Sequence, residues 1–189
     1  MHIVYMHIKS TINGILRAYP IIMIYSTMML YIMSSDLDYL YLLIVLWIGE
    51  GINYNLKYNF FRPIFGDNIP FLGRGARPYA AKNCGLFLSK KQKKKLTSYG
   101  MPSGHSQNSA LFATFLILKL LSSGVSNVSS YIKIAVIAGW SLSVMVSRWV
   151  FKCHTVQQII IGAALGTFFG FSAFKMKDYI LFVINKSAF

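Results

Sequence analysis

The sequence predicts an all-α fold: an integral-membrane bundle of about five transmembrane helices, with a long basic loop between the second helix and the third. Hydrophobic residues make up 55% of the 189 residues, and the mean hydropathy is positive at +0.51. Charged residues make up 13%, about half the share in soluble domains. A helix is the expected form in lipid because it satisfies every backbone N–H and C=O within the segment.

Five apolar stretches are long enough, or nearly long enough, to cross a bilayer as helices. They cover residues 18–33, 39–56, 106–121, 132–150 and 156–174 of one domain, 1–189. In the last stretch, Gly162, Gly166 and Gly170 are expected to permit close packing against another helix of the chain. The later apolar patch 179–184 is too short to span a membrane and is expected at the interface.

The loop 57–101 is rich in Gly, Pro, Lys and Arg, and a loop of this length is usually functional or disordered. Its run KKQKKK, at 90–95, is expected to draw the loop toward anionic lipid. Over the whole chain, 19 Lys and Arg face 5 Asp and Glu. With this hydropathy, the excess of positive charge favours lipid headgroups or a phosphorylated substrate as partners, and no nucleic acid is expected.

The two cysteines, Cys84 and Cys153, indicate neither a disulfide framework nor a C-x-x-C metal pattern. Cys153 is expected to be a packing residue.

Residues 101–107, MPSGHSQ, combine the features of a phosphate cradle at the start of a helix. Ser103 can cap the helix, and Gly104 lets the backbone approach an anion closely. The unpaired N–H groups and the positive dipole end favour an anion there. His105, in the first turn, is placed to protonate a leaving oxygen.

Residues 147–158, SRWVFKCHTVQQ, place Arg148 at the end of the fourth expected helix and His154 at the start of the fifth. A neutral imidazole is a competent nucleophile toward phosphorus, and an arginine can hold two equatorial oxygens in a bidentate fork. Gln158 follows His154 by one helical turn on the same face. Its side-chain oxygen is expected to accept the other ring N–H and so to fix the tautomer.

PSGH at 102–105, followed by SR-x5-H at 147–154, resembles the second and third signature motifs of the type 2 phosphatidic acid phosphatase (PAP2) superfamily. The resemblance covers the chain from about Lys57 to the end of the fifth helix. It implies a membrane phosphatase that removes phosphate from a lipid phosphate through a phosphohistidine intermediate, without a metal or other cofactor. The residues GMPSGHSQ at 100–107 and HTVQ at 154–157 with Gln158 are similar to the dolichyl-diphosphatase branch, which favours a polyprenyl diphosphate.

The resemblance also implies a role for each matching residue. His154 would be the nucleophile and His105 the acid, while Gln158 would orient the nucleophile. The residues expected to bind the phosphate are Lys57, Arg77, Ser103, Gly104 and Arg148.

This sequence departs from the family pattern at two places. The third motif usually ends in aspartate, where this chain has Gln158, a neutral amide that orients the ring but stabilises an imidazolium less. The first motif, K-x6-R-P, does not occur at that spacing: after Lys57, one Arg-Pro pair comes too soon, at Arg62, and another much later, at Arg77. We favour Lys57 with Arg77, and Arg62 is the alternative.

Helix parity places these residues on one side of the membrane. Lys57 ends the second expected helix and His105 begins the third, while the next two crossings return the chain at Arg148 and His154. Glu50, seven residues before Lys57 on the same stripe, is expected to pair with Lys57 or an arginine, or to face a wet crevice.

Two criteria disagree about which side this is. Most Lys and Arg residues lie on the side of the motifs, which the positive-inside rule makes cytoplasmic. The dolichyl-diphosphatase resemblance instead implies a lumenal site and is compatible with the endoplasmic reticulum membrane. The side stays open.

Two other functions are compatible with the residues. Gln158 and the irregular first motif suit a catalytically weak membrane scaffold that binds lipid phosphates or partner proteins. A small basic pore-forming protein would conduct ions independently of His105 and His154. A lipid phosphatase is favoured because both motifs and the preceding Lys and Arg residues agree in helix parity.

Overall fold

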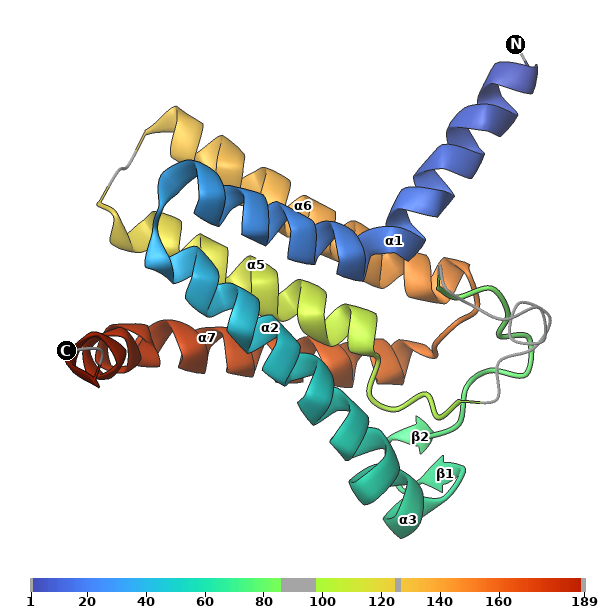
Figure 1. Cartoon of the computed structure of the whole chain (residues 1–189). Coiled ribbons are helices and arrows are strands. Elements are labelled where there is room, and N and C mark those ends of the chain that lie inside the picture. The colour runs from blue at the N-terminus through green and yellow to red at the C-terminus, as the bar shows by residue number, and fades with distance from the viewer. Residues whose placement is uncertain (1, 86–97, 125–126, 188–189) are drawn as a thin grey trace.

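Five long helices form the molecule, and the computed structural model describes residues 2–85, 98–124 and 127–187 of it (Figure 1). The helices are α1 (His2–Ser34), α2 (Leu37–Asn55), α5 (Gly104–Ser122), α6 (Val128–Val150) and α7 (Val156–Ser187). They lie side by side as a bundle, in agreement with the predicted class. The lysine run at 90–95 lies outside the described residues.

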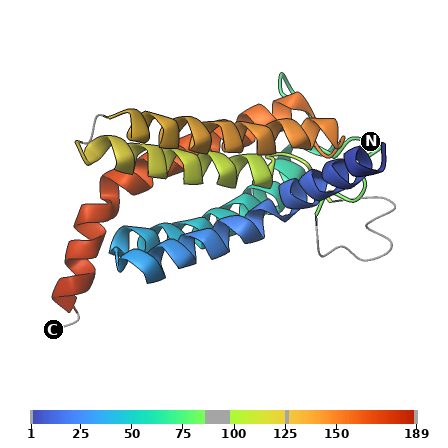
Figure 2. The same ribbon diagram turned by 90° about the horizontal axis from the view of Figure 1, so that it is seen from above.

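The first and last helices extend well beyond the predicted ranges. Pro20 lies inside α1, where a proline removes a backbone hydrogen bond and bends a helix, and the N-terminal part of α1 points away from the bundle (Figure 1). The patch 179–184 was expected at the interface because it is too short to span a membrane by itself, and in the structure it is part of a longer helix. It continues α7, whose C-terminal part turns away from the other helices (Figure 2).

The predicted loop begins later than Lys57. The helical path of α2 continues through a π-helical segment, η1 (Leu56–Phe61), and a short helix, α3 (Arg62–Phe65). Aromatic contacts stabilise this extension, because the Phe61 and Phe65 rings lie 6.1 Å apart and those of Tyr54 and Tyr58 lie 4.8 Å apart. A small antiparallel hairpin of β1 (Asn68–Ile69) and β2 (Gly73–Arg74) then follows.

Within the residues that the structure describes, three helices are long and apolar enough to cross a membrane: Ser10–Ser34 in α1, Val128–Val150 in α6, and Val156–Val183 in α7. Few of their side chains are buried inside the protein. Large apolar side chains such as Trp149 and Ile132 are more than half exposed, as expected for a surface that faces lipid. The chain is therefore a helical membrane protein.

Close packing of α5 against α7 forms the centre of the bundle. An added Cβ on Gly162 would lie 2.5 Å from the carbonyl oxygen of Ser103, and one on Gly170 would lie 2.6 Å from that of Leu111. On Gly166 it would overlap the carbonyl of Gln107. The three glycines therefore allow the two backbones to approach closely within one chain, as their spacing predicts.

The end of the bundle opposite the loop carries an ionic cluster. Lys119, near the end of α5, lies 2.7 Å from Asp36 and 2.5 Å from Asp38, and Lys177 in α7 lies 3.2 Å from Asp38. The cluster ties the start of α2 to both central helices. This ionic cluster is thus separate from the lysine, arginine and histidine residues of the two motifs, which lie at the other end of the bundle.

Gly162→Ala should lower the melting temperature in detergent, because its methyl group would press on the carbonyl of Ser103 and separate α7 from the start of α5. Overpacking of this kind typically costs about 1–3 kcal/mol. Gly139→Ala, in α6, is the matched control, since an added Cβ meets nothing within 4 Å there. Equal melting temperatures for the two variants would contradict this account of the α5–α7 contact.

Candidate functional site

Three segments meet at one end of the bundle and bring the predicted residues together. They are the first turn of α5, the turn between α6 and α7, and the irregular segment that follows the hairpin (Figure 1, right). The η1 segment with Lys57 approaches the same place, because the Nζ of Lys57 would lie 3.7 Å from a Cβ on Gly104. The predicted residues therefore lie on one side of the bundle.

Gln158 orients His154 through a fixed side-chain amide. Its Nε2 donates to the carbonyl oxygens of Arg74 at 2.7 Å and Ala76 at 2.9 Å, so its Oε1 must point the other way. Oε1 lies 3.0 Å from Nδ1 of His154. Both side chains are buried, with 0% of Gln158 and 3% of His154 exposed. The loop backbone thus decides which amide atom faces the ring.

Arg77 determines the tautomer of His154. Its Nη1 lies 2.9 Å from Nε2 of His154, and a guanidinium can only donate. Nε2 is therefore the acceptor and carries the lone pair, while Nδ1–H donates to Gln158. Burial, together with the positive charges of Arg77 and Lys57, holds the pKa of His154 well below its usual range. A neutral imidazole with a free Nε2 lone pair is a nucleophile.

His105 lies in the first turn of α5, where Ser103 is the N-cap. The Ser103 hydroxyl accepts from the hydroxyl of Ser106 at 2.9 Å, and the Ser103 N–H donates to the carbonyl of Gln158 at 3.0 Å. This second bond links the two motifs through the backbone. Nε2 of His105 is buried and has no hydrogen-bond partner among the described residues. A buried polar nitrogen without a partner is expected to have one in the complex with a ligand.

Positive side chains surround His105: Lys57, Arg77 and Arg148 all lie close enough to influence its charge. Burial and the neighbouring Arg77 lower the pKa of Lys57 to about 7, while Glu50 opposes the shift. The carboxylate of Glu50 accepts a bond of 2.6 Å from Asn108 and acts on Lys57 through its charge without a direct ion pair. Glu50 is exposed, as expected if it faces a wet crevice.

Arg148 is 1% exposed and is held mainly by backbone carbonyls. Its Nη1 donates to the carbonyl of Cys84 at 3.0 Å, and its Nη2 donates to the carbonyl of Leu16 at 3.2 Å. The Ser147 hydroxyl accepts from its Nε at 3.1 Å. These contacts occupy most of the guanidinium N–H groups that were expected to bind two phosphate oxygens. Arg148 therefore contributes mainly its positive charge to the site.

The two arginines considered for the first motif lie in different surroundings. Arg77 contacts His154 directly and also donates to Ser98 through Nε at 2.8 Å. Arg62 is exposed at the start of α3. The chain doubles back through the hairpin, which brings the later arginine to the site.

Our expectation for the cysteines was wrong. Cys84 and Cys153 form a disulfide with a Cα–Cα distance of 5.8 Å, across a sequence separation of 69 residues. Two cysteines so far apart in the chain do not form the spacing pattern of a disulfide framework, so the sequence carried no sign of this bond. The bond joins the irregular segment to the turn directly before His154.

Other contributors were also missed. Asn53, in α2, donates through Nδ2 to Oε1 of Gln107 at 2.8 Å, and Nε2 of Gln107 donates to the carbonyl of Gly49 at 2.8 Å. This pair braces the start of α5. Gly100 is required beside Gln158, because an added Cβ would lie 2.6 Å from its amide. Gly100 and Gln107 were noted only as part of the extended motif at 100–107, without a role of their own.

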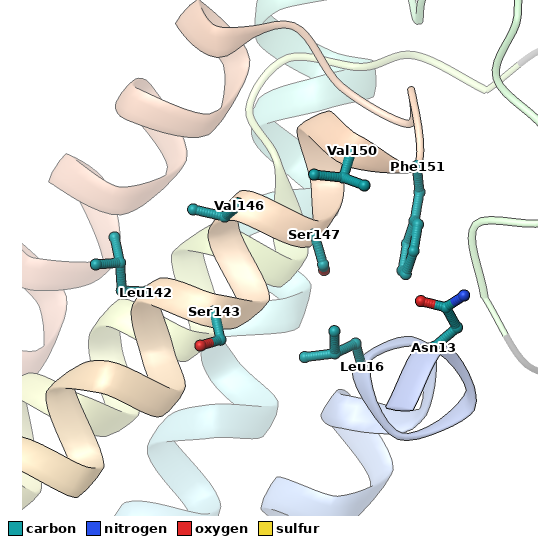
Figure 3. A pocket seen from close by; sticks show the side chains of 8 residues that line it. All are labelled: Asn13, Leu16, Leu142, Ser143, Val146, Ser147, Val150 and Phe151. Atoms are coloured by element: carbon teal, nitrogen blue, oxygen red, sulfur yellow. The ribbon is translucent and has the colours of Figure 1, made fainter. Parts of the chain in front are cut away.

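A groove of about 340 Å³ lies between α1 and α6, next to the site (Figure 3). It is lined mainly by apolar side chains, with a few small polar ones: Asn13, Leu16, Leu142, Ser143, Val146, Ser147, Val150 and Phe151. Ser147 belongs both to this lining and to the contacts of Arg148, so the groove adjoins the positive charges.

Gln158→Glu should destabilise the protein. The carboxylate cannot donate to the carbonyls of Arg74 and Ala76, and each buried acceptor left without a partner typically costs about 1–3 kcal/mol. Gln157→Glu, which adds the same charge at the exposed neighbouring position, should change the stability by no more than about 0.5 kcal/mol. Thermal unfolding in detergent compares the two, and equal melting temperatures would exclude the fixed amide.

Comparison with known proteins gives one match. The family model described as the PAP2 superfamily matches residues 38–181, well over half of the chain, and the match contains every site residue named above from Lys57 to Gln158. No curated protein and no solved structure matches the chain. Members of this family are membrane phosphatases that act on lipid phosphates. The chain therefore belongs to the PAP2 superfamily.

Proposed function

We propose that this protein hydrolyses a polyprenyl diphosphate or a similar lipid phosphate through a phosphohistidine at His154, in a bundle that crosses the membrane five times. The observation that carries the proposal is that His154 contacts Arg77 through Nε2 and Gln158 through Nδ1. These contacts make Nε2 of the neutral imidazole a hydrogen-bond acceptor, and positive charges surround it. The helices α2 and α5 have 19 residues each and lie alongside the three apolar helices, which supports two further crossings.

In the first step, the lone pair on Nε2 of His154 forms a bond to phosphorus, and the bond from phosphorus to the leaving oxygen breaks. The leaving oxygen takes a proton from His105, whose buried Nε2 has no partner among the described residues. The negative charge of the substrate favours the protonated form of His105. The Nδ1–H of His154 remains bonded to Gln158, which stabilises the positive charge that forms on the ring.

In the second step, a water molecule gives its proton to His105 and attacks phosphorus. The N–P bond breaks, its electron pair returns to Nε2 of His154, and inorganic phosphate leaves. His105 thus serves first as an acid and then as a base.

Arg77 and Lys57 would bind the equatorial oxygens of the phosphoryl group. The substrate would replace the direct contact between Arg77 and His154, so that the guanidinium donates to oxygen and the lone pair faces phosphorus. Arg148 and the protonated form of Lys57 add positive charge in the same place. These cations can balance the charge that a divalent ion balances in other phosphoryl-transfer sites, which supports a metal-independent reaction.

The groove between α1 and α6 supports a lipid substrate. Its apolar lining reaches Ser147, which is bonded to Arg148, so a hydrocarbon chain in the groove would place its headgroup beside the positive charges (Figure 3). Both helices are apolar enough to span a membrane, so the groove faces lipid.

Purified protein should release phosphate from a polyprenyl diphosphate in the presence of EDTA, and His154→Ala should abolish the release. His105→Ala should lower kcat about 10²–10⁴-fold, the usual contribution of a general acid. Brief exposure to labelled substrate should leave acid-labile phosphate on the wild-type protein and none on His154→Ala. Phosphate release by His154→Ala at the wild-type rate would overturn the proposal.

Arg77→Ala should raise KM and lower kcat, because it removes the guanidinium next to His154. Arg62→Ala is the matched control and should leave both constants unchanged, since Arg62 is exposed on α3. The reverse pattern would assign the first motif to Arg62.

The pH profile of kcat/KM should fall on the alkaline side with a midpoint near 7. The pKa of Lys57 is lowered to about 7, so the ammonium that attracts the phosphate is present below this pH and is lost above it. We expect a fall of about tenfold, near the lower bound for a hydrogen bond to a charged group. Lys57→Arg should move this limb to higher pH. On the acid side, protonation of His154 should not limit activity until well below its ordinary pKa, because that pKa is lowered.

A further inference from the structure

The disulfide lies at the centre of the candidate site. Cys153 is 0% exposed and Cys84 is 6% exposed, and both pack against Ala81 and Phe151. Cys153 immediately precedes His154, and the N–H groups of both residues donate to the carbonyl of Arg148. The bond therefore connects the irregular segment to the best-fixed part of the histidine turn.

Two arginine hydrogen bonds connect the same two segments as the disulfide, one donated from each side. Arg77, from the irregular segment, donates to the carbonyl of Cys153 at 2.9 Å. Arg148, from α6, donates to the carbonyl of Cys84 at 3.0 Å. Each half of the disulfide thus holds the arginine that comes from the other side.

Electrostatic repulsion acts against this arrangement. Arg77 lies close enough to both Lys57 and Arg148 for their positive charges to repel one another in a buried environment. The hydrogen-bond partners of Arg77 and Arg148 are carbonyls, hydroxyls and the neutral imidazole of His154, none of which carries a negative charge to neutralise them. A covalent link between the two sides opposes the separation of the two arginines.

We propose that the Cys84–Cys153 disulfide positions Arg77 and Arg148 for phosphate binding, through the two carbonyls that it holds beside His154. The proposal rests on the proposed function of the site. It makes the two cysteines positioning residues, which act through the arginines and do not touch the substrate. Loss of the bond should weaken phosphate binding more than it slows the chemical step.

Dithiothreitol provides the first test on the purified wild-type protein. Reduction transfers two electrons and two protons to the disulfide, giving two thiols, while the reagent becomes a cyclic disulfide. The chain has only two cysteines. An effect of dithiothreitol that is seen in the wild type and is missing in the double variant Cys84→Ser/Cys153→Ser is therefore due to reduction of this disulfide. The double variant also reports the unlinked state if the buried bond resists the reagent.

The measured quantities are KM, kcat and the dissociation constant for inorganic phosphate, obtained by calorimetry without turnover. The reduced protein or the double variant should show a KM and a phosphate dissociation constant that rise about tenfold, with a smaller change in kcat. A purely structural disulfide would lower only the active fraction. Unchanged KM and phosphate affinity in the unlinked protein would therefore overturn the proposal.

A double-mutant cycle isolates the positioning effect. In an Arg77→Ala background, removal of both cysteines should weaken phosphate binding much less than it does in the wild type, because one of the residues being positioned is already missing. Equal losses in the two backgrounds would contradict action through Arg77. If the oxidised wild-type protein binds phosphate but releases none from lipid phosphates, the proposed function fails while the cycle still tests the disulfide.

Discussion

Uncompensated positive charge is the constraint that shapes this site. Lys57, Arg77 and Arg148 converge near two histidines, and the arginines are bonded to carbonyl and hydroxyl oxygens. Glu50, whose negative charge acts on Lys57, is bonded to Asn108. Repulsion between these charges destabilises the free protein, and an anion that binds among them relieves the repulsion. The same positive charges can stabilise a phosphoryl group during its transfer.

The bundle makes this concentration of charge tolerable by fixing the backbone around it. Gly162 brings the start of α7 against Ser103, and the Ser103 N–H is bonded to Gln158, so both histidines belong to one rigid unit. Gln158 then extends this unit to the irregular segment through two carbonyls. The positions of both histidines thus depend on the close packing of α5 against α7.

Local spacing predicted much of the site from the sequence. The turn that separates His154 from Gln158 and the capped helix start before His105 are properties of a few consecutive residues, so they could be inferred without a tertiary structure. The class of fold followed from hydropathy for the same reason. Glycine spacing likewise predicted close packing, although it could not name α5 as the partner helix.

Features that depend on the path of the chain could not be predicted in this way. Whether Arg62 or Arg77 reaches His154 depends on the hairpin after α3, and the short strands carry no strong pattern. The aromatic contacts that extend α2 past Lys57 were hidden in a segment that looked like a loop. Cys84 and Cys153 are 69 residues apart, and only the fold brings them together.

The link between Cys84 and Cys153 also bears on the orientation of the protein in its membrane. Cystines persist where the surroundings are oxidising and are rare where glutathione and thioredoxin keep thiols reduced. The Cys84–Cys153 disulfide therefore fits a site on the lumenal side, whereas the distribution of basic residues favours the cytoplasmic side.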